Sequence, residues 1–350
     1  MNKHRNAMKK MRETAKIVNP LLMRSLEPLR DEFPQLYDPL LHLPKIRVGP
    51  QANRPMLRPL LVRLGYEAAG GVQFEKIAPL AAAVELLNIS TYVIDDILDK
   101  SELRQQKPAL HIVHGIGCGI VIGMLLRDVA ELNIENINME HPENAARLRV
   151  ILTDVNRMVY VGQFQDMSFS KDNIPSEKEY FERCYRITGY FIQKCLELGA
   201  LSADGDEQTL EWLRNFGAHY GVAVQIRNDL MDFLPIMAGT LSAGIKGCSH
   251  DDFREGKATL PVIKTLEMCN ATEEAKIMER LGKRELNDKQ MEEVNLIIER
   301  VGGFGYTIKK IEDYLDGAVS ALENVPEGET KHTLTNLTEI AKSVRKWRFS

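Results

Sequence analysis

Cysteine is scarce in this chain, and its spacing argues against two classes of protein. The 350 residues contain five cysteines, an odd number, and none of them forms a Cys-x-x-Cys pair. Most stand in apolar segments with helical spacing, which is typical of reduced cysteines in a protein core. The sequence therefore predicts neither a disulfide-rich secreted protein nor a cysteine-ligated zinc site.

Long apolar runs and a one-sided charge are missing as well. No segment approaches the roughly 20 apolar residues that span a membrane, and the basic N-terminus is not followed by the apolar run of a secretory signal. The 45 basic and 49 acidic residues are interspersed and give a net charge of −4, without the basic stripe of a nucleic-acid-binding surface. We therefore predict a soluble, cytoplasmic protein with no transmembrane segment and no nucleic-acid partner.

Alternating strand patterns are rare, whereas helical spacing of apolar residues runs through most of the chain. The clearest segment extends from Lys76 to Asp99, where apolar residues recur three and four positions apart. Similar segments lie at about 109–131, 143–170, 176–203, 206–233, 259–269, 287–299 and 306–323. Short breaks rich in Gly, Pro or Asn separate them, including 235–247. We predict an all-α, single-domain helical bundle over residues 1–350.

Three aspartates stand at the C-terminal end of the clearest predicted helix. Asp95 and Asp99 share one face because they are four residues apart, and Asp96 lies beside them. Their carboxylates repel one another, and the negative end of the helix dipole adds roughly 0.3–1 kcal/mol per charge. A cation would offset both effects, and Mg²⁺ suits the arrangement because it binds one or two carboxylates together with substrate phosphates. The alternative is an acidic helix end that is simply solvated.

A second cluster repeats this spacing with an amide in first place. It consists of Asn228, Asp229 and Asp232. Two such clusters on separate helices can face each other across the core of a bundle, which is where these folds build metal sites. Arg104 follows the first cluster, and Lys246 and Lys257 follow the second. Together the acids and cations predict a site for a metal-bound diphosphate.

Six motifs, in this order, resemble those of the trans-isoprenyl diphosphate synthase (polyprenyl synthetase) family. They are RPLLVRLGYEAAGG, ELLNISTYVIDDILD, KPALH, GQFQD, QIRNDLMD and DFREGKATLP. The resemblance covers roughly residues 45–345, after an N-terminal helical extension at 1–44. It implies an isoprenoid-synthase-type bundle with a central active-site cavity, a homodimer, and ionisation of an allylic prenyl diphosphate substrate to a carbocation.

The resemblance also implies roles for individual residues. Three Mg²⁺ ions with bound diphosphate would lie between the two acidic motifs. The metal ligands would be Asp95, Asp96, Asp99, Asn228, Asp229 and Asp232, and the five aspartates among them would be the catalytic residues. The diphosphate would be bound by Arg104, Lys246, Lys257 and Gln225. The residues lining the cavity would include Asn88, Ser90 and Thr91.

Three departures from the family pattern fall on positions that relatives use for isopentenyl diphosphate. A family lysine is replaced by Pro55, a histidine by Asn88 and an arginine by Gln105, whereas Arg58 and Arg104 remain. Each charged hydrogen bond to a phosphate is worth roughly 1.5–3 kcal/mol. The losses therefore predict that this second substrate binds at least several tens-fold more weakly.

Selective loss of that half of the site favours an enzyme that resembles class I terpene synthases in function. Such a lyase would ionise one allylic diphosphate and finish by cyclisation or elimination, without isopentenyl diphosphate. Asn228 fits this hypothesis, because terpene synthases commonly begin their second metal motif with Asn.

Two alternatives stay open. One is a prenyltransferase that makes a polyprenyl diphosphate of C20 or longer by condensation with isopentenyl diphosphate. Ser90 and Thr91 are small enough for such a length, although Ile120 and Met124 are candidates for a cavity floor. The other is a weakly active regulatory subunit of a hetero-oligomeric prenyl synthase. Ile187 favours it, because the family has a lysine there that would contact the allylic diphosphate.

Overall fold

Helices make up nearly all of the structure, a computed structural model. It describes residues 2–42, 55–104, 107–135, 137, 142–234 and 250–343. Within these ranges the paired strands are β1 (Leu103–Arg104) and β2 (Lys107–Pro108), which form a short antiparallel ladder directly after the first acidic motif. The predicted all-α fold is confirmed. No helix in the described part of the chain is both long and apolar enough to cross a membrane.

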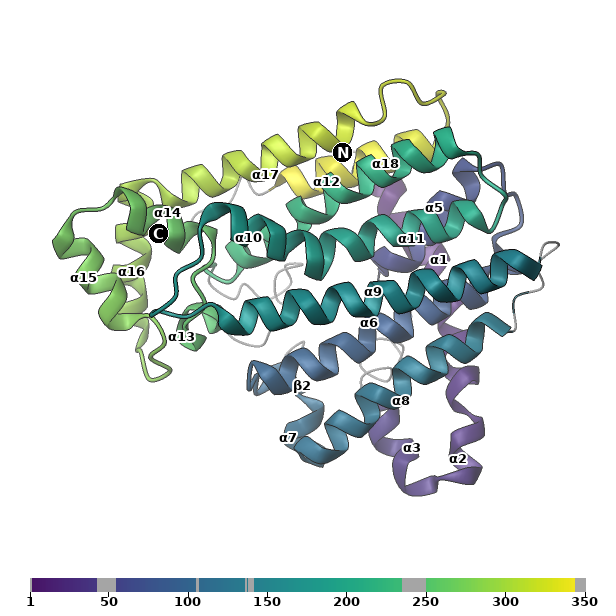
Figure 1. The fold of residues 1–350 in the computed structure, drawn as a ribbon, viewed down its shortest axis with the longest axis horizontal. Helices are drawn as coiled ribbons and strands as arrows, with labels where there is room; N and C mark the ends of the chain where they lie inside the picture. Colours follow the sequence, from purple (N-terminus) through teal and green to yellow (C-terminus); the bar gives the residue numbers. More distant parts are fainter. Residues whose placement is uncertain are drawn as a thin grey trace.

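A set of helices runs roughly side by side along the long axis of the molecule (Figure 1). They are α6 (Ala78–Leu98), α8 (Ile116–Glu135), α9 (Pro142–Ser168), α11 (Tyr190–Leu201), α12 (Glu207–Met231) and α17 (Gly303–Ser320). Helix α6 packs against α8, and α12 packs against both α11 and α17. The two acidic motifs therefore end two helices of the same bundle.

Helix α6 is deeply buried over its first half, and its sequence explains why. Apart from Pro79, every residue from Ala78 to Ser90 is buried, and α1, α5 and α8 pack around the helix. A helix that is apolar on all sides belongs in the interior of a protein. Its polar C-terminal turn, with Asp95 and Asp99, then reaches the interior cavity of the bundle.

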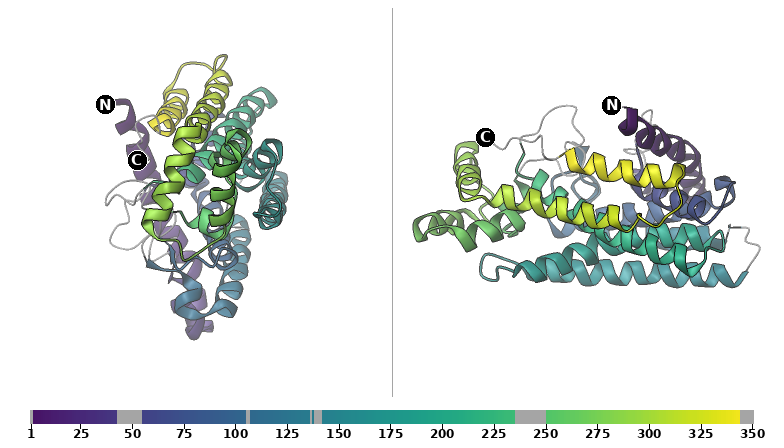
Figure 2. Two further views of the ribbon diagram at one scale, coloured as in Figure 1. Left: turned by 90° about the vertical axis from the view of Figure 1, so that its left-hand side faces the viewer. Right: turned by 90° about the horizontal axis from the view of Figure 1, so that it is seen from above.

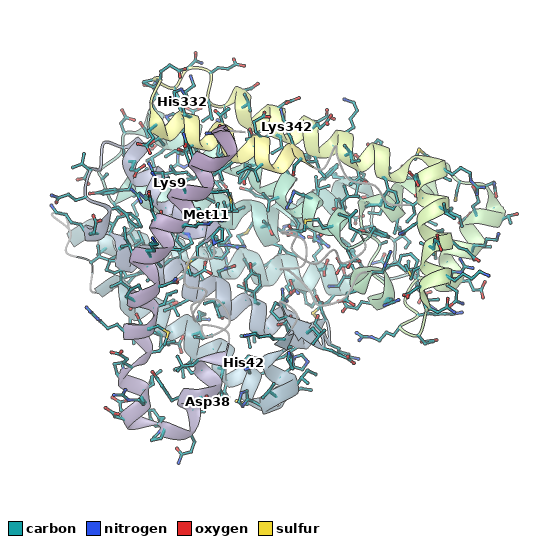
Figure 3. All side chains as sticks on the ribbon, turned by 180° about the vertical axis from the view of Figure 1, so that it is seen from behind. Lys9, Met11, Asp38, His42, His332 and Lys342 are labelled. Atoms are coloured by element: carbon teal, nitrogen blue, oxygen red, sulfur yellow. The ribbon has the colours of Figure 1, made fainter. Side chains whose placement is uncertain are left out.

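The first and last described helices lie against each other. Residues near the N-terminus form α1 (Asn2–Leu26), α2 (Pro28–Glu32) and α3 (Pro34–Leu40). Helix α1 packs on α5 (Leu57–Ala68), α6 and α18 (Glu329–Ala341), as Figures 2 and 3 show from two further sides. The ammonium group of Lys10 bridges Glu67 at 2.7 Å and Glu329 at 2.8 Å. This ion pair fixes α1 between the two neighbouring helices.

Helices α5 and α11 cross almost in contact because a glycine stands on each side. A Cβ atom on Gly65 would lie 2.0 Å from the carbonyl oxygen of Leu196, and one on Gly199 would lie 1.9 Å from that of Val62. Only glycine permits so close an approach. The crossing sets Arg58, near the start of α5, over the Phe191 ring on α11, with 4.6 Å from guanidinium carbon to ring centroid.

Several element boundaries differ from the sequence-based expectation. The segment 109–131 is divided at Gly115, which has a φ of 85°, into α7 (Leu110–His114) and α8. The segment 176–203 is interrupted by one turn of π-helix, η2 (Tyr185–Gly189), between α10 (Glu177–Cys184) and α11. The predicted break at 235–247 lies outside the described residues.

Four of the remaining elements lie together at one end of the bundle (Figure 1). They are α13 (Asp251–Glu255), α14 (Leu260–Met268), α15 (Ala271–Arg280) and α16 (Asp288–Val301). The short η1 (Phe74–Lys76) directly precedes α6 and packs on α5. Neither α15 nor α18 was singled out by apolar spacing. Helix α13 matters most for function, because it carries the last of the six motifs to the ends of α6 and α12.

Candidate active site

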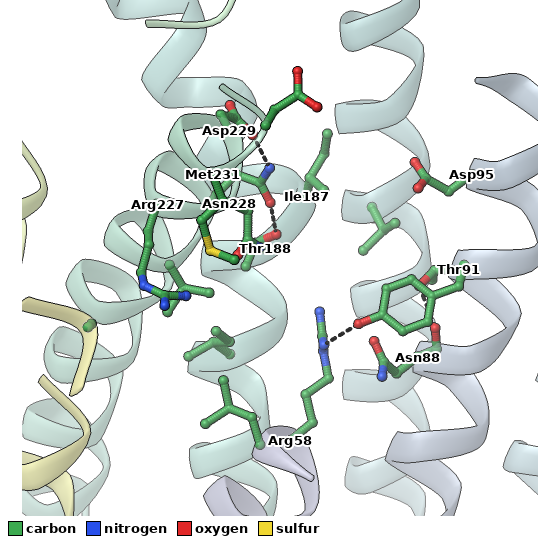
Figure 4. A pocket seen from close by; sticks show the side chains of 18 of the residues that line it. Arg58, Asn88, Thr91, Asp95, Ile187, Thr188, Arg227, Asn228, Asp229 and Met231 are labelled. Carbon is green, nitrogen blue, oxygen red and sulfur yellow. Dashed lines mark hydrogen bonds between the residues drawn. The ribbon is translucent and has the colours of Figure 1, made fainter. Parts of the chain in front are cut away.

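A cavity of about 420 Å³ opens between α6 and α12. Its walls come from α1, α5, α6, α9, α11, α12 and α18, together with η2 and α13. Asp95 and Asp229 stand on opposite walls, and Arg58 and Arg227 lie further along (Figure 4). The predicted central cavity is confirmed, and both acidic motifs reach it.

The three aspartates of the first motif divide into two groups. Asp95 and Asp99 line the cavity, whereas Asp96 is buried and is not among the lining residues. Both carboxylate oxygens of Asp96 accept hydrogen bonds from Arg104 Nε, at 2.8 and 3.1 Å. Burial opposes the charge of Arg104, but Asp96 and Asp95 outweigh it and raise the pKa of the guanidinium. Asp96 therefore anchors the predicted diphosphate-binding Arg104.

Lys257 links the first motif to other acids. Its ammonium group lies 2.6 Å from Asp99, 3.2 Å from Asp166 and 3.4 Å from Glu255. Oxygens of Asp99, Asp252 and Glu255 also approach within 4.8 Å of one another. Such a set of hard oxygen ligands fits Mg²⁺. Sequence reasoning had taken Asp252 and Glu255 only as part of a motif, because their helix cannot be placed against α6 from spacing alone.

In the second acidic motif, the carboxylate of Asp229 accepts several hydrogen bonds from other side chains. Asp229 Oδ2 accepts hydrogen bonds from Tyr180 Oη at 2.7 Å and from Arg183 Nη1 at 3.1 Å, and its Oδ1 accepts one from Gln225 Nε2 at 2.7 Å. Burial raises the pKa of Asp229, and the Arg183 charge counteracts part of this rise. Asn228, next to it, lines the cavity with its neutral amide.

Asp232, the last residue of that motif, holds the start of α13. Its two carboxylate oxygens accept the backbone N–H groups of Asp251 at 2.9 Å and Asp252 at 3.1 Å. Carboxylates are favoured at this position because the N–H groups of a first helical turn lack partners within the helix. This contact brings the α13 motif to the cavity, where Asp252 and Lys257 both form part of the wall.

Arg183 is a site residue that sequence reasoning missed. It belongs to none of the six motifs, yet it is buried and lines the cavity. Its Nε donates to Asp166 Oδ1 at 2.6 Å, while Nη1 reaches Asp229. The surrounding sequence, EKEYFERCYRI, holds several other charged residues, so the sequence alone does not single out Arg183. Through Asp166, Arg183 joins the second motif to Lys257.

The predicted ligand Gln225 on α12 and residues of η2 occupy the same wall. Thr188 donates a hydrogen bond from its hydroxyl to Gln225 Oε1, and Gln225 in turn donates to Asp229. Ile187 lines the cavity beside them. A π-helical turn often marks a functional site. Here it carries Thr188 and Ile187, and the family resemblance implies a lysine at the Ile187 position that would contact the allylic diphosphate.

The predicted cavity-lining residues lie on different faces of α6. Asn88 and Thr91 line the cavity. Ser90 does not: its hydroxyl donates to the carbonyl oxygen of Gly123 on α8 at 2.7 Å. Ile120 and Met124, the suggested floor, have exposed fractions of 42% and 61% and lie on the outside of α8. The helix period explains the difference, because Ser90 and Thr91 point about 100° apart.

Arg58, which the sequence analysis retained, shares its part of the cavity with a second arginine, Arg227. Arg58, from α5, reaches the Tyr92 hydroxyl with Nη1 at 3.5 Å. Arg227, from α12, lines the same cavity (Figure 4), next to apolar residues such as Met231. Burial lowers the pKa of Arg227, but guanidinium groups stay charged near neutral pH. Sequence reasoning assigned no role to Arg227, because the family pattern specifies no residue type at that position of the second motif.

Two residues that the sequence analysis named stand outside the described ranges. Lys246, expected to bind the diphosphate, and Gln105, one of the three departures, both lie outside the described residues. Pro55, a second departure, lines the cavity at the entry to α5. It contributes neither a charge nor an N–H donor there.

Residues 51–298 match the family model for polyprenyl synthetase. The chain belongs to this family. The enzyme is 30% identical to a geranylgeranyl pyrophosphate synthase of Geoglobus acetivorans, over 94% of this chain and 96% of the relative. Its structure is similar to that of geranylgeranyl pyrophosphate synthetase from Pyrococcus horikoshii, with a TM-score of 0.84, 25% identity, and coverage of 97% and 99% of the two chains.

A third similar protein is a polyprenyl synthase from Caulobacter crescentus, solved as a complex with calcium and isoprenyl diphosphate. Its structure gives a TM-score of 0.74 at 26% identity, covering 92% of this chain and 97% of that one. These relatives are named as synthases of prenyl diphosphates. The main functional hypothesis from the sequence, a terpene-synthase-like lyase, is therefore wrong. That hypothesis rested on charges at three motif positions and did not consider Arg227.

Proposed function

We propose that this polyprenyl synthetase is a prenyltransferase that condenses an allylic prenyl diphosphate with isopentenyl diphosphate. The observation that carries the proposal is a single cavity with cations in two places. Arg104 and Lys257 lie beside the acids, and Arg58 and Arg227 lie further along. Two diphosphate groups need two such places, because each carries several negative charges. The names of the relatives support the same reaction.

The allylic diphosphate would bind at the acidic end. Asp95 and Asp99 would hold Mg²⁺, which would stabilise the negative charge that develops on the leaving diphosphate. Arg104, fixed by Asp96, would bind its oxygens together with Lys257 and Gln225. Lys246 joins this set through the family resemblance. When Lys257 contacts phosphate, it would exchange part of its present contact with Asp99 for the ligand.

The isopentenyl diphosphate would bind between Arg58 and Arg227. Asn88 supplies a nearby amide, whose Nδ2 now donates to Glu85 at 3.2 Å. Apolar lining residues on several walls exclude water from the space between the two substrates. They include Ile94, Val159, Val224 and Leu234. Exclusion of water protects a carbocation from capture until the new carbon–carbon bond forms.

We propose products of C20 or longer. The supporting residue is Thr91, which lines the cavity with a small side chain. Ser90, the other small residue, lies against Gly123, where α6 and α8 pack closely. A growing chain directed along α6 would meet no aromatic ring at Thr91.

We also propose a homodimer. Large apolar side chains are exposed on neighbouring helices α7, α8 and α9. They include Ile112, Val113, Ile116, Ile120, Val121, Met124, Tyr160, Val161 and Phe164. A concentration of exposed apolar side chains on neighbouring helices is typical of an interaction site. A second copy of this chain is the occupant that the family resemblance implies.

One incubation series tests the function. Purified protein and Mg²⁺ are mixed with C10, C15 or C20 allylic diphosphate, with and without labelled isopentenyl diphosphate, and extracts are analysed for diphosphates, alcohols and hydrocarbons. We expect longer diphosphates only when both substrates are present. Hydrocarbons from one substrate, or no product under any condition, would contradict the proposal. If product appears only after another subunit is added, the regulatory-subunit alternative, which Ile187 favours, replaces it.

A further inference from the structure

The second acidic motif has little negative charge to offer a metal ion. Its three residues all line the cavity, and the first of them, Asn228, offers a neutral amide in place of a carboxylate. Both oxygens of Asp229 accept hydrogen bonds from protein side chains. Both oxygens of Asp232 accept backbone N–H groups at the start of α13. The motif therefore serves, as folded, to hold the protein together.

Arg183 already acts as the cation of this motif. It lies between Asp229 and Asp166, with side-chain exposure of 6%. Recruiting Asp229 to a metal would leave the guanidinium buried beside one acid, and it would bring a second cation close to the first. Both effects oppose metal binding at Asp229. Releasing Asp232 would free the N–H groups of Asp251 and Asp252, which position Lys257 through the short α13.

The first motif differs in its exposure and in the number of carboxylates beside it. Asp95 also accepts hydrogen bonds, from Arg104 Nη2 at 3.1 Å and from Gln163 Nε2 at 3.0 Å. The Asp95 side chain is 30% exposed and points into the cavity (Figure 4). Asp99 is bound by the ammonium group of Lys257, which stands at the end of a flexible side chain and can turn to a phosphate. Two further carboxylates, from Asp252 and Glu255, lie close to Asp99. Metal ligands are therefore concentrated at the end of α6.

We propose that the second acidic motif supplies no carboxylate ligand, so that the enzyme holds two Mg²⁺ ions with its diphosphate instead of the three that the family resemblance implies. In place of the third ion, Arg183 supplies the positive charge inside the protein. The inference rests on the proposed diphosphate site but does not depend on whether isopentenyl diphosphate is the second substrate.

Native mass spectrometry tests the ion count directly. The full chain is saturated with magnesium acetate and inorganic pyrophosphate, and the mass added to each pyrophosphate-bound species is converted to a number of Mg²⁺ ions. We expect two ions in the natural protein and three in Asn228→Asp, which restores a carboxylate at the cavity wall. Asn6→Asp is the matched control, an identical change at an exposed position on α1, and it should keep two ions. Three ions in the natural protein, or two in Asn228→Asp, would overturn the inference.

A second variant removes the internal cation. In Arg183→Met, Asp229 and Asp166 lose their shared partner, so Mg²⁺ and pyrophosphate together should raise the melting temperature more than they do in the natural protein. Arg183→Lys, which keeps the charge, should show the smaller natural shift. An equal shift in all three proteins would count against the role of Arg183. If Arg183→Met does not fold, the Asn228→Asp comparison decides alone.

The outcomes separate this inference from the proposed function. An enzyme that condenses the two substrates but holds three ions would overturn the ion count alone. One that holds two ions but forms no prenyl product would overturn the function alone.

Discussion

At the scale of single residues, the site is a chain of alternating charges that joins the two acidic motifs. Asp99 contacts Lys257, Lys257 contacts Asp166, Asp166 contacts Arg183, and Arg183 contacts Asp229. Such buried networks are costly to break at one member, because the remaining partner keeps its charge without compensation. A substitution at one residue of this charge network therefore also affects the other residues in it.

Lys257→Met is expected to destabilise the protein. The change leaves Asp99, Asp166 and Glu255 close together without their shared cation, so the free energy of unfolding should fall by about 3–5 kcal/mol. Urea unfolding followed by circular dichroism measures the effect. Mg²⁺ with pyrophosphate should restore part of the loss, since these ions bind the same carboxylates, and Lys257→Arg should show a smaller loss. A stability equal to that of the natural protein would refute this account of the network.

Arg227→Leu is expected to raise the KM for isopentenyl diphosphate by about 10- to 100-fold, because one charged hydrogen bond to a phosphate is lost. The KM for the allylic substrate should change less than twofold. Arg58→Leu should behave alike, and Arg227→Lys should retain part of the affinity. Steady-state kinetics with each substrate varied in turn provides the measurement. An equal rise for both substrates would place Arg227 outside the isopentenyl site.

At the scale of helices, the position of Arg58 depends on the close crossing of α5 and α11. Gly199→Ala would drive a methyl group into the Val62 carbonyl. We therefore expect the free energy of unfolding to fall by at least about 1–3 kcal/mol. Gly305→Ala on α17 is the matched control, because no atom lies within 4 Å of its added Cβ. Alanine's better helix propensity should leave that variant equal or slightly more stable. Thermal unfolding of the two variants distinguishes packing from propensity.

The helices that apolar spacing predicted are those with a long, regular pattern. Helix α6 follows its expected range closely, because its apolar run ends where the aspartates begin. The π-helical turn at Tyr185–Gly189 was not predictable, since it depends on packing against α9 and α12. Motif spacing likewise located Asp95, Asp99 and Lys257 in one site. It could not locate Arg183 or Arg227, because their roles depend on which helices become neighbours.

At the scale of the whole molecule, the exposed apolar face of α7, α8 and α9 predicts the oligomeric state. Phe164, with an exposed fraction of 75%, and Met124 are central candidates for contact with a second copy. The double variant Phe164→Glu, Met124→Glu should shift the protein from dimer to monomer in size-exclusion chromatography with light scattering. Leu296→Glu, on α16, is an equally drastic control outside this face and should stay dimeric. A monomeric natural protein would refute the dimer.

The cavity wall combines residues from both ends of the described chain. Met8 and Met11 of α1 and Leu337 and Ile340 of α18 line it, and Lys10 joins the two helices across 319 positions in sequence. During synthesis on a ribosome, α1 therefore emerges long before its neighbour exists. Until translation reaches α18, one side of the reaction chamber stays open to water, and the nascent chain cannot shelter a carbocation.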